Sequence, residues 1–367
     1  MRWRRREARD EPLIGVVVPV HNVAAYLPAA LESLLAQTHS RLDVVVVDDG
    51  STDESGAVAD EYAGRDRRIR VLHTHNQGLG AARNHGVSHA RGTLLAFLDS
   101  DDRLPTDAYA TMRTSLARSG SDFVTGSIVW WEAEGLREPP WMRRLHNPGR
   151  VGIQAKEHPE VLGDVFAWNK LYRRSFWDAA RLAWPEGLRY EDQPTTTKAY
   201  LAGRFDVIPE VVYHWRVRKD GTSITQQRSS VADLADRLAS KRMALASVAA
   251  YGDPRTGEVF LDRVLAGDLH RYFAEIPGCT DDWWALLRDA VVEFWGERSL
   301  VHSGLPPVHR LTGWLVEQGR RADAAAVMAT APLPRILDDG SPRLDVSVLP
   351  ELTDVPPEAI ALRPYEL

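Results

Sequence analysis

Short apolar runs recur through the first third of the chain and predict four β-strands. Residues 14–19 (IGVVVP) and 42–50 (LDVVVVDDG) are continuous, β-branched stretches that end at turn-forming residues. Such runs are typical of strands that are buried on both faces of a sheet. Two shorter runs, at 69–73 (IRVLH) and 93–99 (TLLAFLD), predict a third and a fourth strand.

Helix-like segments separate these strands. The leucines between residues 27 and 35 fall on one side of a helix. Ser51 and Glu54 have the spacing of a capping box, which would open a second helix. A third helix is predicted over residues 79–90. Alternating strands and helices with short connections indicate an α/β fold, with a mostly parallel sheet and helices on both faces.

The rest of the chain is less regular. Residues 122–131 (DFVTGSIVWW) predict one more strand. From about residue 229 apolar residues recur at helical spacing, which predicts a helical C-terminal module over 229–331. The last segment, 332–367, is rich in proline, and we expect an extended, linker-like tail. It stops without a closing element, as expected of a chain cut from a longer protein.

Composition and charge exclude several classes of protein. Hydrophobic residues make up 44% of the chain and charged residues 26%, as in soluble globular proteins. No apolar run approaches the ~20 residues of a membrane span. The formal net charge of −6 argues against a nucleic-acid partner, which would need a basic face. Cys279 is the single cysteine, which excludes an internal disulfide and suits a reducing cytoplasm.

Residues 1–11 form a basic tail that lacks the apolar core of a secretory signal. Such a tail is either a frayed, solvated end or a contact with an anionic membrane surface. We therefore expect a cytoplasmic protein, with a peripheral position at the inner face of the plasma membrane as the second alternative.

Polar residues follow three of the predicted strands. His21 and Asn22 come after the first strand, Asp48 and Asp49 end the second, and residues 99–102 (DSDD) follow the fourth. Ligands bind at the carboxyl ends of the strands in sheets of this kind. We therefore expect the three clusters to form one site.

The glycine cradles that hold nucleotides in other α/β proteins are missing. Neither G-x-G-x-x-G nor G-x-x-x-x-G-K-[ST] follows the first strand, so a nucleotide would be held by side chains. The carboxylate of Asp49 can accept the imide N–H of a uracil ring, and Asn76 with Gly78 allows close approach to a base. Arg83 suits a phosphate or the edge of the base.

Two acidic groups can carry chemistry. Asp99 and Asp101 form an Asp-x-Asp pattern of hard oxygen ligands, which suits Mg²⁺ or Mn²⁺ completed by waters or phosphate oxygens. The alternative is a solvated turn before Pro105. Glu191 and Asp192 precede a predicted helix, where they either cap its N-terminus or supply a general base that deprotonates a hydroxyl.

Six motifs occur in a fixed order: VVVPVHN, VVVDDGSTDES, HTHNQGLGAARNHGV, LLAFLDSDDRLP, RYEDQP and YHWRVRKDGTSIT. Together they resemble the inverting, metal-dependent glycosyltransferases of family 2, which have the nucleotide-diphospho-sugar transferase (GT-A) fold. The resemblance covers residues 12–228. The pattern looks closest to bacterial enzymes that build or decorate cell-wall teichoic acids and surface polysaccharides.

The resemblance implies roles for the residues that match the donor-binding motifs. The nucleotide would contact six of them, with the uracil at Asp49: Pro19, Asn22, Asp49, Asn76, Gly78 and Arg83. Asp99 would lie at the ribose side of the donor, and Asp101 would bind the metal ion.

The resemblance also implies the residues of the reaction itself. Asp192 would be the general base, and Glu191 would support it or bind the sugar. Arg216 and Ser223, on a loop that can close, would meet the diphosphate. His214 is a further metal ligand, a diphosphate contact or a packed strand histidine.

The implied activity is transfer of a hexosyl or N-acetylhexosaminyl group, with inversion, from a UDP-sugar to a hydroxyl of a cell-wall or surface glycopolymer. The implied cofactor is Mg²⁺ or Mn²⁺, and the acceptor is a polymeric or lipid-linked glycan or teichoic acid. Residues 12–228 would be the catalytic domain, with a nucleotide-binding half (12–110) and an acceptor-binding half (111–228). The helical module, 229–331, would form a homo-oligomer, bind a polymeric acceptor or brace the catalytic domain.

Two other functions stay open at this point. A sugar-phosphate nucleotidyltransferase would need a loop rich in Gly and Lys or Arg after the first strand, and this chain lacks it. A non-catalytic scaffold that binds nucleotide sugars is disfavoured by the intact Glu191–Asp192 pair.

Aromatic residues and one lysine offer candidates for acceptor binding. Seven of the twelve tryptophans lie between residues 130 and 215. The candidates for stacking on sugars are Trp168, Trp177 and Trp215, and those for an acceptor groove are Trp130 and Trp131; core packing is the alternative for each. Lys170 either contacts an anionic acceptor or is a surface lysine.

Overall fold

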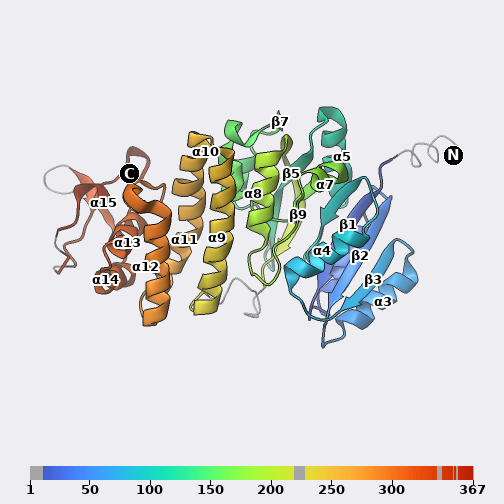
Figure 1. Ribbon diagram of the computed structural model, residues 1–367, viewed down its shortest axis with the longest axis horizontal. Helices are drawn as coiled ribbons and strands as arrows, with labels where there is room; N and C mark the ends of the chain where they lie inside the picture. Colours follow the sequence, from blue (N-terminus) through green and yellow to red (C-terminus); the bar gives the residue numbers. More distant parts are fainter. Residues whose placement is uncertain (1–10, 219–227, 337–340, 350, 353, 367) are drawn as a thin grey trace. The chain divides into compact units, whose positions relative to one another are not determined.

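The computed structural model describes residues 11–218, 228–336, 341–349, 351–352 and 354–366 (Figure 1). The chain forms two compact units. Unit 1 comprises residues 1–220 and 243–251, and unit 2 comprises residues 221–242 and 252–367.

Unit 1 is built around a sheet that has nine strands among the described residues. The strands lie in the order β3-β2-β1-β4-β8-β5-β9-β7, and β6 pairs with β5. β1, β2, β3 and β4 are mutually parallel, as are β5 and β9, whereas β7 and β8 run antiparallel to their neighbours. The bounds are β1 Ile14–Val20, β2 Leu42–Asp49, β3 Ile69–Thr74, β4 Leu94–Phe97, β5 Phe123–Glu132, β6 Gly135–Arg137, β7 Arg150–Ile153, β8 Lys170–Arg173 and β9 Phe205–Arg216.

Helices connect these strands (Figure 1). Their bounds are α2 Leu27–Leu35, α3 Ser55–Arg65, α4 Leu79–His89, α5 Ala108–Ser119, α6 Pro140–His146, α7 Arg174–Ala179 and α8 Asp192–Ala202.

The valines of β2 show why helices cover both faces of the sheet. Val45 and Val47 pack with Ala82 of α4 on one face. Val44 and Val46 alternate with them and so point to the opposite face, where they are equally buried. A run of buried valines needs cover on both sides. The predicted α/β architecture is confirmed.

The parallel strands end at one edge of the sheet. Val20 lies opposite Asp48, and Asp49 lies opposite Thr74. This register places the polar residues that follow β1, β2 and β3 next to one another. The polar edge expected from the sequence therefore exists.

Pro19 lies inside β1, which continues to Val20. Val17 still belongs to the β1–β4 ladder, because its carbonyl accepts from the backbone N–H of Leu98 at 3.0 Å. Pro19 follows two residues later, beyond the last β4 pair. Its missing N–H therefore interrupts no ladder at that position.

The predicted capping box is wrong. α3 begins at Ser55, and its N-cap residue Glu54 makes no side-chain capping bond. The Ser51 hydroxyl instead accepts from the backbone N–H of Asn22 at 3.1 Å, and the backbone N–H of Ser51 donates to Asp48 at 3.1 Å. The loop after β2 therefore uses Ser51 to hold the end of β1.

Three of the candidates for acceptor binding belong to the core instead. Trp177 is 2% exposed and lies against the rings of Phe97 and Trp184. Lys170 is fully buried, so it is neither a surface lysine nor placed to touch a polymer. Trp168 is also buried and stacks on Tyr213, with ring centroids 3.8 Å apart.

Unit 2 is helical, as predicted from the spacing of its apolar residues. Helix α9 (Val231–Tyr251) is divided between the two units. The other helices have the bounds α10 Pro254–Val259, α11 Ala266–Leu269, α12 Asp281–Trp295, α13 Pro307–Glu317, α14 Arg321–Thr330 and α15 Pro357–Ile360, with a π-helical turn over Phe260–Leu265. Among the described residues, no helix is both long and apolar enough to cross a membrane.

The segment after residue 332 is not the extended tail that we expected. Strands β10 (Pro334–Ile336) and β11 (Pro342–Leu344) form a short antiparallel pair. The guanidinium of Arg310 in α13 is buried and binds the Glu366 carboxylate, with 3.0 Å between Nη2 and Oε2. Charge pairing and the apolar residues Ala359 and Leu362 hold this end of the chain to unit 2.

Candidate active site

The site predicted from the sequence lies at the carboxyl edge of the sheet in unit 1. Its side chains come from the ends of β1, β2 and β4, the loop between β3 and α4, α4 itself, the start of α8 and the end of β9. Ser223 lies outside the described residues. The other predicted residues fall into three neighbouring groups.

The first group surrounds His21. Its Nδ1 lies 2.9 Å from the carbonyl oxygen of Asp49, so Nδ1 carries the proton, because a carbonyl can only accept. Nε2 is then an acceptor, and it lies 3.2 Å from the amide nitrogens of both Asn22 and Asn76. His21 thus links the ends of β1 and β2 to the loop after β3. The sequence left its role unassigned.

Asp49 has a structural task in addition to its predicted contact with uracil. Its carboxylate accepts from the backbone N–H groups of Gln77 at 2.9 Å and Gly78 at 2.8 Å. These bonds fix the loop that carries Asn76. Gly78 has a φ of 91°, a conformation that favours glycine, so the loop depends on this residue for its shape.

Asn22 also adopts a left-handed conformation, with a φ of 53°, which asparagine tolerates better than most residues. Its side-chain oxygen accepts from the backbone N–H of Thr52 at 2.8 Å and of Asp53 at 3.3 Å. Asn22 therefore joins the loops after β1 and β2.

The second group is centred on Arg83, which is 2% exposed. Its Nη2 donates to Asp99 at 2.7 Å, and its Nη1 binds Glu191. Burial lowers the pKa of Arg83, but the carboxylates of Asp99 and Glu191 raise it more strongly, so the net direction is upward. In this structure Arg83 joins two acids, whereas the sequence analysis placed it on the nucleotide.

Helix α4 approaches the α8 region closely enough for this contact because of Gly80. A Cβ atom at Gly80 would lie 2.0 Å from the carbonyl oxygen of Pro185 and 3.5 Å from Glu191. A larger residue would therefore separate α4 from the start of α8. The glycine of the L-G-A-A-R segment was a signal that the sequence analysis did not use.

Glu191 and Asp192 differ in their surroundings. Glu191 is 3% exposed, and burial raises its pKa to about 7, with the charge of Asp192 acting in the same direction and Arg83 against it. Asp192 is half-buried and is the first residue of α8, where its Oδ1 accepts from the backbone N–H of Gln193 at 2.8 Å. The more accessible carboxylate is therefore that of Asp192.

The third group is the acidic loop, residues 99–102. Asp102 is buried, and its carboxylate accepts from the Tyr213 hydroxyl at 2.8 Å and the backbone N–H of Arg216 at 2.7 Å. Burial raises the pKa of Asp102 well above its usual value, and the charges of Asp101 and Asp99 add to this effect. Asp102 thus attaches the loop to β9.

Asp101 faces Arg218, a residue that the sequence analysis missed. Its carboxylate lies 2.7 Å from Nη2 of Arg218. Burial raises the pKa of Asp101, and Asp99 adds to this effect, whereas Arg218 opposes it. Asp101 is thus paired with a cation, and burial is the main cause of its raised pKa.

Arg216 lies beside the same loop; the resemblance implied a position on a loop that can close, whereas Arg216 is the last residue of β9. Its Nε donates to the carbonyl oxygen of Asp101 at 2.6 Å. Its guanidinium packs 3.8 Å from the ring centre of Trp131, and that of Arg103 lies at the same distance from this ring. Trp131 thus supports two cations beside the acidic loop, which favours a site for an anion.

His214 packs against Arg103, the residue that directly follows the acidic loop. Its Nδ1 accepts from Nε of Arg103 at 3.2 Å. Burial lowers the pKa of His214 to about 4, and the charge of Arg103 acts in the same direction. These contacts correspond to the packed strand histidine among the three alternatives.

The residues of the acidic loop fit a divalent cation whose remaining ligands come from the substrate. Among the described residues, no three His, Cys, Asp or Glu side chains form a group that could hold a metal ion by themselves. Mg²⁺ and Mn²⁺ are usually bound by one or two carboxylates together with phosphate oxygens and waters. Asp101 and Asp99 supply carboxylates of that kind, and in this structure each is paired with an arginine, Arg218 and Arg83 respectively.

Comparison with known proteins agrees with this geometry. Residues 15–179 match the model of glycosyl transferase family 2. The glycosyltransferase GlyG of Streptococcus pneumoniae serotype 4 is 40% identical over 232 residues, which cover 58% of this chain and 74% of GlyG. The uncharacterized glycosyltransferase EpsJ of Bacillus subtilis is 34% identical over 211 residues, or 56% of this chain. The chain spans about three fifths of the length of EpsJ and of the putative glycosyltransferase EpsH, 61% and 62% respectively.

Solved structures share the fold. The crystal structure of S. aureus TarS has a TM-score of 0.66 and 20% identity, covering 91% of this chain and 58% of that one. The structure of TarS 1–349 in complex with UDP-GlcNAc has a TM-score of 0.61 and 19% identity, covering 91% of this chain and 96% of that one. At this identity the likeness establishes the GT-A fold and nothing finer. Together with the match to GlyG, these findings establish that the chain belongs to glycosyl transferase family 2.

Proposed function

We propose that residues 12–228 are the catalytic domain of a metal-dependent, inverting enzyme that transfers a hexosyl or N-acetylhexosaminyl group from a UDP-sugar to a hydroxyl of a cell-wall or surface glycopolymer. The observation that carries the proposal is the buried Arg83, which joins Asp99 after β4 to Glu191 before α8. A donor-side acid and the acidic pair of the reaction are thereby held in one site. Family membership disfavours the nucleotidyltransferase and scaffold alternatives.

Two observations support a UDP-sugar as the donor. TarS 1–349, which shares the fold, was crystallised with UDP-GlcNAc. In this chain His21, Asp49 and Asn76 gather hydrogen-bonding groups at the ends of β1, β2 and β3. A uracil ring needs such donors and acceptors.

The half-buried Asp192 is the proposed general base. Its carboxylate would take the proton of the acceptor hydroxyl, and the freed oxygen would attack the anomeric carbon from the face opposite the nucleotide. The bond from that carbon to the diphosphate oxygen breaks, and UDP leaves with the electron pair. One displacement inverts the configuration without a covalent enzyme intermediate.

Charge builds up on the diphosphate as it leaves. Arg216 lies beside the acidic loop, with its guanidinium stacked on Trp131, and would stabilise that charge where it develops. Asp101, with Asp99, would hold a divalent cation, which would supply additional positive charge to the diphosphate.

The test of this function is the substitution Asp192→Asn. We expect transfer of a radiolabelled sugar to fall by at least about a thousandfold, because a general base is lost with little change in shape. Binding of UDP with Mn²⁺ should change by less than about twofold. Asp178→Asn is the control, since Asp178 is an exposed residue of α7 paired with Arg174. Near-normal transfer by Asp192→Asn would exclude this base.

A further inference from the structure

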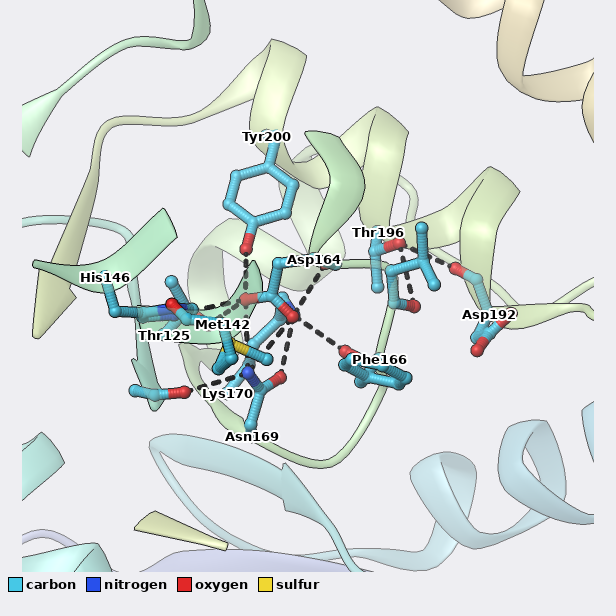
Figure 2. Close-up of polar contacts among 12 residues, drawn as sticks. Thr125, Met142, His146, Asp164, Phe166, Asn169, Lys170, Asp192, Thr196 and Tyr200 are labelled. Atoms are coloured by element: carbon cyan, nitrogen blue, oxygen red, sulfur yellow. Dashed lines mark hydrogen bonds and ion pairs between the residues drawn. The ribbon is translucent and has the colours of Figure 1, made fainter. Parts of the chain in front are cut away.

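A second charged group in unit 1 has no part in the chemistry described so far. It consists of Asp164 and Lys170 with the side chains around them, and we call it the Asp164 cluster (Figure 2). Asp164 and Lys170 are both fully buried, with 3.0 Å between Oδ1 and Nζ. A buried ion pair is often no more stabilising than an apolar pair of similar volume. Stability alone therefore does not explain why Asp164 and Lys170 are buried together, so we consider which parts of the chain they hold in place.

The carboxylate of Asp164 collects donors from several elements. It accepts from the Thr125 hydroxyl of β5 at 2.6 Å, the Tyr200 hydroxyl of α8 at 3.0 Å and the Asn169 amide at 3.1 Å (Figure 2). Nε2 of His146 lies 3.4 Å away. Burial alone would raise the pKa of Asp164, but Lys170, followed by His146 and Thr125, lowers it. The carboxylate is thus held ionised in one position.

Lys170 holds the backbone that follows Asp164. Its ammonium group donates to the carbonyl oxygens of Asp164 at 3.0 Å and Phe166 at 2.7 Å, and to the side chain of Asn169 at 2.8 Å. Two carbonyls on either side of Val165 are therefore fixed by one side chain. The segment from 164 to 169 has its shape set by Lys170.

This segment is attached to the first turns of α8. The Thr196 hydroxyl lies 3.2 Å from the carbonyl oxygen of Val165, 2.9 Å from that of Asp192 and 3.3 Å from that of Gln193, and it has one proton to donate (Figure 2). Tyr200, about one turn further along α8, binds Asp164 itself. The helix that begins at Asp192 is thus tied to the Asp164 cluster at two points.

We propose that the Asp164–Lys170 pair is a positioning device for the transfer reaction, which fixes segment 164–169 against α8 and thereby sets the location of the Asp192 carboxylate. The inference rests on the proposed function, in which Asp192 is the base. The electrostatics agree: burial lowers the pKa of Lys170, whereas the charges of Asp164 and Asp192 raise it, so Lys170 also interacts with the base. Lys170 and Asp164 are positioning residues and need not touch substrate.

The first experiment compares Lys170→Met and Asp164→Asn with Asp206→Asn in the full chain. Asp206 is an equally buried carboxylate of the same unit, and it accepts from Ser115, Ser119 and Ser121 at 2.6–2.7 Å. All three substitutions should lower the melting temperature. Only the first two should lower kcat, by about tenfold or more, because a small displacement of a catalytic group is costly.

The affinity for UDP with Mn²⁺ separates positioning from general damage to the site. We expect it to stay within about twofold of the unchanged protein in all three variants. The inference is overturned if Lys170→Met and Asp164→Asn lower kcat no more than Asp206→Asn does. It is also overturned if nucleotide affinity falls in proportion to kcat.

If Lys170→Met and Asp164→Asn fail to fold, two milder variants, Thr196→Val and Thr196→Ser, test the proposal. Thr196→Val removes the hydroxyl between Val165 and α8, and Thr196→Ser retains it. We expect kcat to fall about threefold to fivefold for Thr196→Val and to stay near normal for Thr196→Ser. Equal values for the two would overturn the proposal.

The proposed function is tested separately, by the transfer activity of Asp192→Asn. If Asp192→Asn remains active, the base assignment fails whatever Lys170→Met does. If Asp192→Asn is inactive and Lys170→Met has the normal kcat, the base assignment stands and the positioning role is excluded.

Discussion

The Asp164 cluster and the acidic loop are two groups of charged residues in unit 1, and the pKa values of Asp164 on one side and of Asp101 and Asp102 on the other are shifted in opposite directions. Lys170 and several neutral donors surround Asp164, and they lower its pKa despite complete burial. Burial raises the pKa values of Asp101, which is half-buried, and Asp102, which is buried, and neighbouring carboxylates add to this effect. Residues of one type thus differ because of the groups that face them.

This difference separates charge that serves the fold from charge that serves a ligand. The Asp164 cluster contains its own counter-ion, so a bound cation would gain little there. The acids of the acidic loop also have counter-ions, Arg83 at Asp99 and Arg218 at Asp101, but its carboxyl groups still repel one another. A divalent cation with a diphosphate would relieve that repulsion, which is the electrostatic basis of the proposed donor site.

Removing a ligand of the proposed cation should have the largest effect. Asp101→Ala should lower transfer by about a thousandfold, because the charge that stabilises the leaving diphosphate is lost. Titration calorimetry with UDP should show that Mn²⁺ no longer strengthens binding. Asp178→Ala, on the surface of α7, should behave as the unchanged protein. Retained Mn²⁺ dependence in Asp101→Ala would place the cation elsewhere.

Neutralising one acid in each group should change stability in opposite directions. Asp164→Asn should destabilise unit 1 by about 3–5 kcal/mol, since it leaves Lys170 as a buried charge without its partner. Asp101→Asn should stabilise the protein by up to about 1 kcal/mol, because burial, and to a smaller extent Asp99, disfavours the charge of this carboxylate in the folded state. Thermal unfolding at pH 7 without metal or nucleotide measures both. Two losses of similar size would show that the groups do not differ.

Glu191 should give the smallest effect, visible as a pH dependence. Burial raises its pKa to about 7 in the folded protein, above the ordinary value of about 4.3 in an unfolded chain. Its contribution to stability is therefore greatest below pH ~4.3 and is lost as the pH rises to about 7.

The measurement for Glu191 is the melting temperature of Glu191→Gln and of the unchanged protein from pH 4 to pH 8, without metal. The difference between the two curves should change mainly between pH ~4.3 and pH ~7, where the carboxyl loses its proton. A constant difference over this interval would show that Glu191 has no raised pKa.

The expectations that held rest on local signals. Consecutive valines in 44–47 are buried wherever a parallel sheet has helices on both faces, so this pattern predicts the strand without knowledge of its neighbours. The capping box failed because Ser51 bonds to Asn22, a residue of another loop, which the spacing of Ser51 and Glu54 does not encode.

Lys170 shows the limit of composition as a guide. Lysines are rarely buried without a partner. The sequence shows no such partner for Lys170, so it predicted either a surface lysine or a contact with an acceptor. The partner, Asp164, is only six residues away, but the donors that complete the cluster come from β5 and α8. Burial of a charge depends on all of these contacts at once.

The sequence by itself determined that a parallel sheet carries polar residues at its carboxyl edge, because strand periodicity and strand ends are local properties of the chain. Tertiary structure decided which charges are neutralised. Arg83 reaches Glu191 across more than a hundred residues of chain, and Arg218 reaches Asp101 from beyond β9. The energy of a charge depends on distances in space and on exclusion of water, and both arise only when the chain has folded.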